Sequence, residues 1–290
     1  MIVYLILHYN MAFLPLGVDV DLDTGNVLVA VTENSRIEKF TNNGSFINSW
    51  DGTLSGGSQL KYPSDLVVDS HTHDVYVVER GTSRVQKFTY DGNFIKSWGQ
   101  EGSADGEFAA PHSIDLDSAG NVFVADTFND RIQKFTNEGE FLNGWGGNGT
   151  GNGQFDYPTA IAVDSKSNHV YVADKGNYRI QKFDNNGNFI KSWGHAGSGN
   201  NEFGSIYGIE VDPKKGHVLV CNNSHIQIFT KNGSFIKYWG THGHGDGQFS
   251  SASGISVDLA GNVFVSEVSR VQKFANNGGF ILKWLLIYNP

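Results

Sequence analysis

Residues 155–194 read FDYPTAIAVDSKSNHVYVADKGNYRIQKFDNNGNFIKSWG, and the architecture of the chain follows from this stretch. It contains four short runs of apolar and β-branched residues, separated by Gly, Asn and Asp. Runs of this kind between turn-forming residues are typical of β-strands and hairpins. No apolar i, i+3, i+4 pattern lasts long enough for a helix. The stretch therefore predicts four short strands.

The same four-run unit occurs six times. GNFIKSWG stands at 92–99 and again at 187–194, with looser copies at 44–50, 139–146, 233–240 and 279–284. The tryptophans that end these copies are 48, 47, 48, 46 and 45 residues apart. Six units of four strands predict an all-β, six-bladed β-propeller with four-stranded antiparallel blades. The blades are expected to end near Trp50, Trp98, Trp145, Trp193, Trp239 and Trp284.

Closure into a ring is expected rather than an open solenoid. Six units without atypical polar end-caps favour closure, because the faces and inner strand of each unit must be covered by its neighbours. Each tryptophan then serves as a large apolar plate between adjacent blades. Its indole N–H is expected to reach the polar loop beyond.

The repeat unit resembles the NHL repeat. The shared pattern is F-x-x-P-x-x-I-x-V-D, then G-N-V-Y-V-A-D, N-x-R-I-Q-K-F and G-x-F-I-x-x-W-G, and residues 155–194 are its fullest copy. The resemblance covers about residues 12–284 and is specific for fold. It implies a protein- or RNA-binding module, as in the tripartite-motif ubiquitin ligases. A weaker resemblance to the peptidyl-hydroxyglycine amidating lyases implies a metal-dependent enzyme.

We expect residues 12–290 to form a single six-bladed NHL propeller, preceded by an apolar segment at 1–11. MIVYLILHY at the start has no Lys or Arg before its apolar run and no small-residue cleavage site. It fits a secretory signal poorly and is too short to span a membrane. An extra edge strand or the remainder of a preceding repeat is expected here.

The composition limits the classes of partner. A net charge of −9 argues against a nucleic-acid partner, although a local basic patch stays open. The single cysteine, Cys221, cannot form an intrachain disulfide, so a disulfide-stapled secreted scaffold is excluded. We expect a monomer without a membrane span. Its compartment is not determined by the sequence, and a cytoplasmic location is favoured.

The order of strands defines two faces of the propeller. If the strands of each blade are named a to d from the channel outwards, the d–a and b–c loops share one face and the a–b and c–d hairpins share the other. The hairpins are nearly uniform, and an Asp that ends each strand a suits an Asx turn, so no function is assigned to them. The d–a and b–c loops vary, as recognition loops do. The candidate partner-binding residues on or near this face are His112, Phe128, Arg131, Tyr157, Tyr178, Arg179 and Tyr207.

Five of the six units carry an arginine at the start of strand c, and acidic or amide residues end strand b. An ion pair across each b–c turn is favoured over an exposed ring of anion-binding arginines. Both interpretations apply to Arg131 and Arg179.

Three carboxylates occupy one position of strand a on alternate blades: Asp19, Asp115 and Glu210. A closed ring would point them at the axis with threefold spacing, where they could hold a hard cation such as Ca²⁺. The alternative is that each caps a neighbouring strand or faces a wet channel. If all three ionise together, repulsion should make one of them take up a proton.

Histidine separates an enzyme from a binding module. The lyase resemblance implies several zinc-ligating histidines at the tops of inner strands, but only His112 stands at such a position, and a zinc site needs three protein ligands. We therefore predict a non-catalytic scaffold that binds a protein or peptide through the d–a/b–c face. A metal-dependent enzyme of the amidating-lyase or lactonase type and an RNA-binding module are the alternatives.

Overall fold

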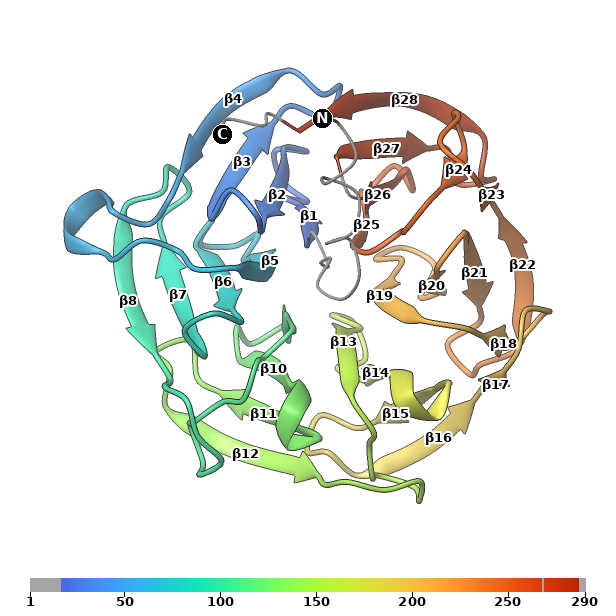
Figure 1. Ribbon diagram of the computed structural model, residues 1–290, viewed down its shortest axis with the longest axis horizontal. Helices are drawn as coiled ribbons and strands as arrows, with labels where there is room; N and C mark the ends of the chain where they lie inside the picture. Colours follow the sequence, from blue (N-terminus) through green and yellow to red (C-terminus); the bar gives the residue numbers. More distant parts are fainter. Residues whose placement is uncertain (1–16, 268, 287–290) are drawn as a thin grey trace, which may run out of the picture.

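Six four-stranded antiparallel sheets are arranged around a central channel in the computed structural model (Figure 1). The structure describes residues 17–267 and 269–286. The predicted segment at 1–11 lies outside them. Each sheet is built from consecutive strands, with strand a at the channel and strand d at the rim. The predicted all-β, six-bladed propeller is confirmed.

The strands of the first three blades have these bounds. Blade 1 contains β1 (Val18–Val20), β2 (Val27–Val31), β3 (Arg36–Phe40) and β4 (Phe46–Trp50). Blade 2 contains β5 (Pro63–Val68), β6 (Val75–Glu79), β7 (Arg84–Phe88) and β8 (Phe94–Trp98). Blade 3 contains β9 (Ser113–Leu116), β10 (Val122–Asp126), β11 (Arg131–Phe135) and β12 (Phe141–Gly146).

The other three blades follow the same order. Blade 4 contains β13 (Pro158–Val163), β14 (Val170–Asp174), β15 (Arg179–Phe183) and β16 (Phe189–Trp193). Blade 5 contains β19 (Ile206–Val211), β20 (Val218–Asn222), β21 (His225–Phe229) and β22 (Phe235–Trp239). Blade 6 contains β25 (Ile255–Val257), β26 (Val263–Glu267), β27 (Arg270–Phe274) and β28 (Phe280–Leu285).

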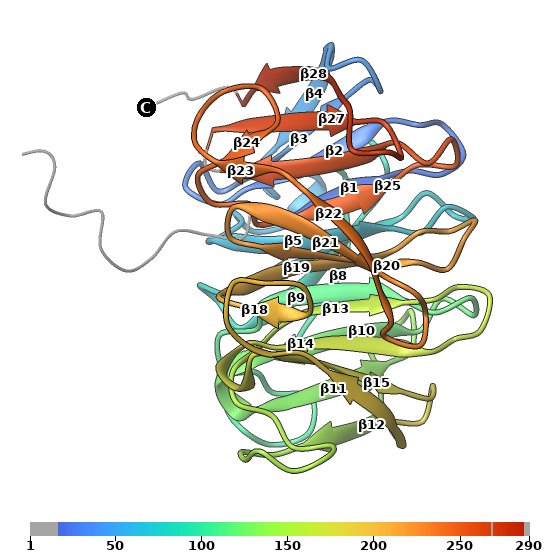
Figure 2. The same ribbon diagram turned by 90° about the vertical axis from the view of Figure 1, so that its right-hand side faces the viewer.

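The d–a and b–c loops carry the remaining short elements. Two parallel pairs lie in d–a loops: β17 (His195–Ala196) with β18 (Glu202–Phe203), and β23 (Thr241–His242) with β24 (Gln248–Phe249). Three single-turn 3₁₀ helices are η1 (Leu54–Gly56), η2 (Thr127–Asn129) and η3 (Lys175–Asn177). Figure 2 shows β18, β23 and β24 on one side of the disc and the a–b hairpins on the other.

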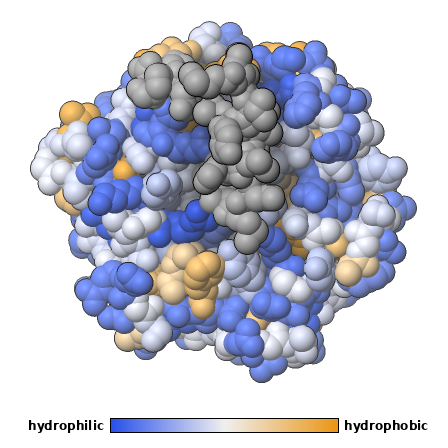
Figure 3. All heavy atoms as spheres, viewed as in Figure 1, coloured by the Kyte–Doolittle hydropathy of each residue, from blue (hydrophilic) through white to orange (hydrophobic). Residues whose placement is uncertain are grey.

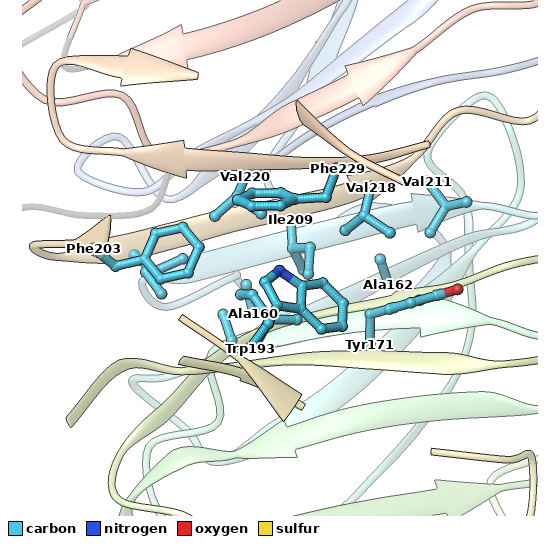
Figure 4. Packing of buried hydrophobic residues seen from close by; sticks show 13 residues of the cluster. Ala160, Ala162, Tyr171, Trp193, Phe203, Ile209, Val211, Val218, Val220 and Phe229 are labelled. Atoms are coloured by element: carbon cyan, nitrogen blue, oxygen red, sulfur yellow. The ribbon is translucent and has the colours of Figure 1, made fainter. Parts of the chain in front are cut away.

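The core lies between the blades. Trp193, at the end of blade 4, packs between Tyr171 of its own blade and Phe229 of blade 5, with ring centroids 6.2 and 5.9 Å apart (Figure 4). A Cβ added at Gly233, in the c–d turn of blade 5, would lie 2.6 Å from this indole. All six tryptophans pack in this way against a turn glycine of the next blade, and Trp284 against Gly44 joins blade 6 to blade 1. The predicted plates between blades are therefore present.

The prediction for the indole N–H was wrong. In all six tryptophans the indole nitrogen is buried and has no hydrogen-bond partner within the described part of the chain. The indole instead packs on the glycine turn and on the phenylalanine that ends strand c of the next blade. The close fit of the ring leaves the N–H inside the apolar contact between blades.

The predicted turns at the ends of strand a are confirmed. In every blade an Asp carboxylate accepts a hydrogen bond from the backbone N–H two residues further on, for example from His71 to Asp69 at 2.9 Å. This is the Asx turn, which closes the a–b hairpin locally. The six aspartates are Asp21, Asp69, Asp117, Asp164, Asp212 and Asp258.

Candidate functional site

Four carboxylates on the innermost strands face the central channel. Asp19 of β1, Asp115 of β9 and Glu210 of β19 line one cavity of about 570 Å³. Asp65 of β5 lies close to them, since its charge raises the pKa of both Asp115 and Glu210. The three predicted carboxylates thus share the channel, but Asp65 from an intervening blade breaks the expected threefold spacing.

The aspartates of the channel link neighbouring blades. Each accepts a hydrogen bond from a backbone N–H of the next blade, so each caps the adjacent strand a. The pairs are Asp19 with Val68 at 2.8 Å, Asp65 with Ile114 at 3.2 Å and Asp115 with Val163 at 2.6 Å. This arrangement matches the capping alternative of the sequence analysis.

Burial and mutual repulsion keep these carboxyl groups partly protonated. Burial raises the pKa of Asp19 to about 6, that of Asp65 to about 7 and that of Asp115 to about 8. The pKa of Glu210 is raised well above its usual range, first by burial and then by the charges of Asp115 and Asp19. The channel therefore holds protons at neutral pH.

The cavity beside these carboxylates is bordered by a–b hairpins. Its wall includes His71, Ser118 and Ser165, on the face to which the sequence assigned no function. Among residues 17–267 and 269–286, no three His, Cys, Asp or Glu side chains form a group that could hold a metal ion. Calcium binding in the channel stays a prediction, which a rise in melting temperature with millimolar Ca²⁺ would test.

The opposite face carries a cluster of aromatic side chains around a lysine. Phe128 of η2 and Tyr157 of the following d–a loop have ring centroids 5.3 Å apart. Lys175, at the start of η3, places its Nζ 5.2 Å from the ring centroid of Tyr157 and 4.1 Å from that of Tyr207 in β19. Both distances are typical of cation–π contacts. We call Phe128, Tyr157, Lys175 and Tyr207 the aromatic surface.

The aromatic surface is open to solvent at Phe128, which is 60% exposed. Figure 3 shows an apolar area on this face at the place where Figure 1 shows η2. The sequence predicted three of the four residues. The structure brings Phe128, Tyr157 and Tyr207 together, and it adds Lys175.

Tyr178 lies on the same face, but among the described residues its ring does not pair with the aromatic surface. It follows η3 with φ at +54° and is 42% exposed. Tyr157 also has a positive φ, of +60°. The left-handed region is costly for bulky side chains. Tyr62, which precedes Pro63 in the d–a loop of blade 2, has φ at +51°. Three tyrosines are therefore held in unfavourable backbone conformations on this face.

Arg131 and Arg179 have structural roles. Their Nε atoms each donate to the carboxylate across the b–c turn, to Asp126 and Asp174 at 2.7 Å. Their remaining N–H groups hold carbonyl oxygens of the d–a loops, such as Gly151 O at 2.8 Å from Arg179. The predicted ion pair across the turn is present in four blades. Blade 1 pairs Arg36 with Glu38 instead, and blade 5 joins His225 to Asn222.

His112 lies under this face, near the axis. It is only 3% exposed, and its Nδ1 has no hydrogen-bond partner within the described ranges. Burial, with smaller contributions from Arg80 and Lys175, lowers its pKa to about 3, so its imidazole is neutral. His112, Asp65 and Tyr207 line a small cavity of about 30 Å³ at the axis. His112 therefore does not meet a partner from the surface directly.

Comparison with models of known families identifies one of the six repeats. An NHL-repeat model matches residues 155–183, which cover the first three strands of blade 4. The chain is a six-bladed β-propeller whose fourth blade contains an NHL repeat. A search among curated proteins found no match. No helix in the described part of the propeller has the length and apolar character needed to cross a membrane.

Solved structures share the fold of this propeller. A streptogramin B lyase matches with a TM-score of 0.63 at 16% identity, over 95% of this chain and 84% of that one. A catalytically inactive virginiamycin B lyase from Staphylococcus aureus with quinupristin has a TM-score of 0.63 at 15% identity, over 94% and 85%. A gluconolactonase from Xanthomonas campestris has a TM-score of 0.63 at 14% identity, over 89% and 84%. Identities this low show the fold alone.

The sequence analysis did not identify Lys175, Arg80 or Asp65 as residues of a site. Aligning the repeats offers a signal for the first two, because Arg80 and Lys175 stand at one repeat position, directly after strand b. Asp65 stands at a position of strand a that glycine, serine or alanine occupies in the other five blades. Its participation in the channel depends on side-chain direction, which the repeat pattern does not give.

Proposed function

We propose that this propeller is a binding module that holds a protein or peptide partner on its d–a/b–c face. The aromatic surface carries the proposal. Exposed aromatic side chains on a rigid scaffold are enriched in protein interfaces, because they offer a large contact area at a small entropic cost. One ring–ring contact and two cation–π contacts hold Phe128, Tyr157 and Tyr207 together before any partner arrives.

A comparison between blades shows that the fold does not require a tyrosine at position 157. Tyr157 precedes Pro158 with a positive φ, and Ala110 precedes Pro111 in the same conformation, with φ at +45°. The backbone of this position thus accepts alanine. The tyrosine ring at 157 therefore serves something other than the turn, and binding is the role that its position favours.

The enzyme alternative has less support. Cys221 is buried in β20, and burial raises the pKa of its thiol. His112 is the single histidine near the axis on this face that the sequence singled out, and no metal-holding group occurs in the described residues. The lyases and the gluconolactonase named above keep this alternative open at the level of fold.

Selection from a displayed peptide library tests the proposal. We expect selected peptides to bind the wild-type chain and to lose about tenfold or more in affinity to Phe128→Ser, as for a central interface residue. Leu259→Ser is the matched control, because Leu259 is 44% exposed in an a–b hairpin on the opposite face. Peptides that bind both variants equally well would contradict the proposed surface.

A further inference from the structure

Two cations on the d–a/b–c face stand where the fold does not need them. Arg80 and Lys175 directly follow β6 and β14. Blades 1 and 3 carry threonine at this position, and the hydroxyl groups of Thr32 and Thr127 each donate to a proline carbonyl of the next blade at 2.7 Å. A small polar residue therefore satisfies the repeat, and the cations of blades 2 and 4 have another role.

Neither cation has a carboxylate partner in the part of the chain that the structure describes. The arginines of strand c each have an acidic partner across the turn, such as Glu79 for Arg84 at 2.6 Å. Within residues 17–267 and 269–286, no ion pair joins Arg80 or Lys175 to a carboxylate. The ammonium group of Lys175 lies instead over the rings of Tyr157 and Tyr207. Two unpaired cations are notable in a chain whose net charge is −9.

Geometry places Lys175 beside the axial cavity, because its Nζ lies 4.1 Å from the ring centroid of Tyr207, and Tyr207 lines this cavity together with His112. The charge of Arg80 acts on the pKa of the same residues, His112 and Tyr157, from the neighbouring blade. The unpartnered Nδ1 of His112 is buried beside the axial cavity of about 30 Å³. A buried polar atom without a partner is costly, and a water molecule in this cavity would satisfy it. We call Arg80 and Lys175, which lie above His112, the cationic seat.

We propose that the cationic seat binds a carboxylate of the partner, so that the partner segment is an acidic peptide. This inference rests on the proposed function. A carboxylate suits paired cationic donors, and the neighbouring aromatic surface would pack against apolar atoms beside it. Nucleic acid is a weaker fit, because its affinity comes from many phosphate contacts, and two cations on an acidic chain supply few.

A matched pair of labelled peptides tests the inference by fluorescence anisotropy. One peptide alternates glutamate and tyrosine, and the other has glutamine in place of each glutamate. We expect the glutamate peptide to bind about tenfold more tightly, and the double variant Arg80→Glu/Lys175→Glu to remove this preference. Lys214→Glu is the control, since Lys214 is exposed on an a–b hairpin and should leave the preference intact.

Three outcomes would overturn the inference. The cationic seat does not bind a carboxylate if the wild-type chain binds the two peptides equally well. The same conclusion holds if the double variant still prefers the glutamate peptide. A single-stranded RNA that competes with the peptide, and whose binding depends on Arg80 and Lys175, would show that the cationic seat binds phosphate.

If the melting temperature of the double variant differs from that of the wild type, Arg80→Gln and Lys175→Gln replace it. A glutamine peptide whose binding still depends on Phe128 leaves the proposed function standing.

Discussion

Tyr178 occupies a position that other blades give to small polar residues. The residue before strand c has a positive φ in four blades, and it is Ser35, Ser83 and Asp130 in the other three. Small polar side chains tolerate this region better than a tyrosine ring does. Because other blades form the same turn with serine or aspartate, the fold does not require a tyrosine at position 178. The exposed ring of Tyr178, on a strained backbone, thus marks the d–a/b–c face as the candidate functional face.

Replacing Tyr178 should make the protein more stable. Tyr178→Asn keeps the left-handed conformation at a lower cost, so we expect the free energy of unfolding to rise by about 1 kcal/mol. Urea denaturation monitored by tryptophan fluorescence measures the change. A loss of stability of similar size would show that the ring supports the fold and has no separate role.

At the scale of the element, the contact between a tryptophan and a turn glycine holds each pair of blades together. Gly233 has φ at +79°, and a Cβ there would meet the ring of Trp193. Gly216 has φ at +65°, with nothing within 4 Å of its added Cβ. The two glycines share the backbone conformation and differ only in the neighbouring blade, so they separate backbone strain from packing.

Gly233→Ala should therefore be more harmful than Gly216→Ala. We expect Gly216→Ala to cost about 1 kcal/mol through its positive φ, and Gly233→Ala to cost about 1–3 kcal/mol more through overpacking. Trp193→Ala should cost about 3–5 kcal/mol, because it leaves a cavity between blades. Equal midpoints in urea for the two alanine variants would show that the indole does not pack as described.

The repeat pattern predicted the elements well because they depend on local chemistry. Strand runs, Asx turns and the ion pairs of the b–c turns each follow from residues close in sequence. The buried indole N–H of Trp193 could not be predicted in this way, because it depends on how a ring fits the next blade. Likewise, Asp65 could be placed in the channel only after the blades were packed together. Arg80 and Lys175 depart from the repeat pattern, so the pattern does not predict them.

At the scale of the whole molecule, the ring closes around buried carboxyl groups, and this makes stability depend on pH. Burial raises the pKa of Asp115 to about 8, so the folded state keeps a proton that the unfolded state loses near pH 4. The contribution of Asp115 to the free energy of unfolding is therefore largest at acidic pH and is lost as the pH rises towards 8. Below about pH 6.5 the lowered pKa of His112 opposes the trend, because the unfolded state then binds the proton.

We therefore expect the free energy of unfolding to fall between about pH 6.5 and 8, by up to about 1.4 kcal/mol per pH unit for each proton held. Asp115→Asn should reduce the slope, since Asn keeps the acceptor for Val163 N and cannot ionise. Urea titrations at several pH values measure both slopes. A stability that rises over this window in the wild type would mean that the channel carboxyl groups ionise without cost.

Hydrogen–deuterium exchange with a library-selected peptide would show which face of the ring the partner covers. We expect slower exchange of the backbone amides at 127–130, 155–157 and 175–178, which surround Phe128 and Lys175, and unchanged exchange in the a–b hairpins. Protection confined to 69–74 and 117–121, beside the carboxylate-lined cavity, would contradict this expectation and move the binding site to the opposite face.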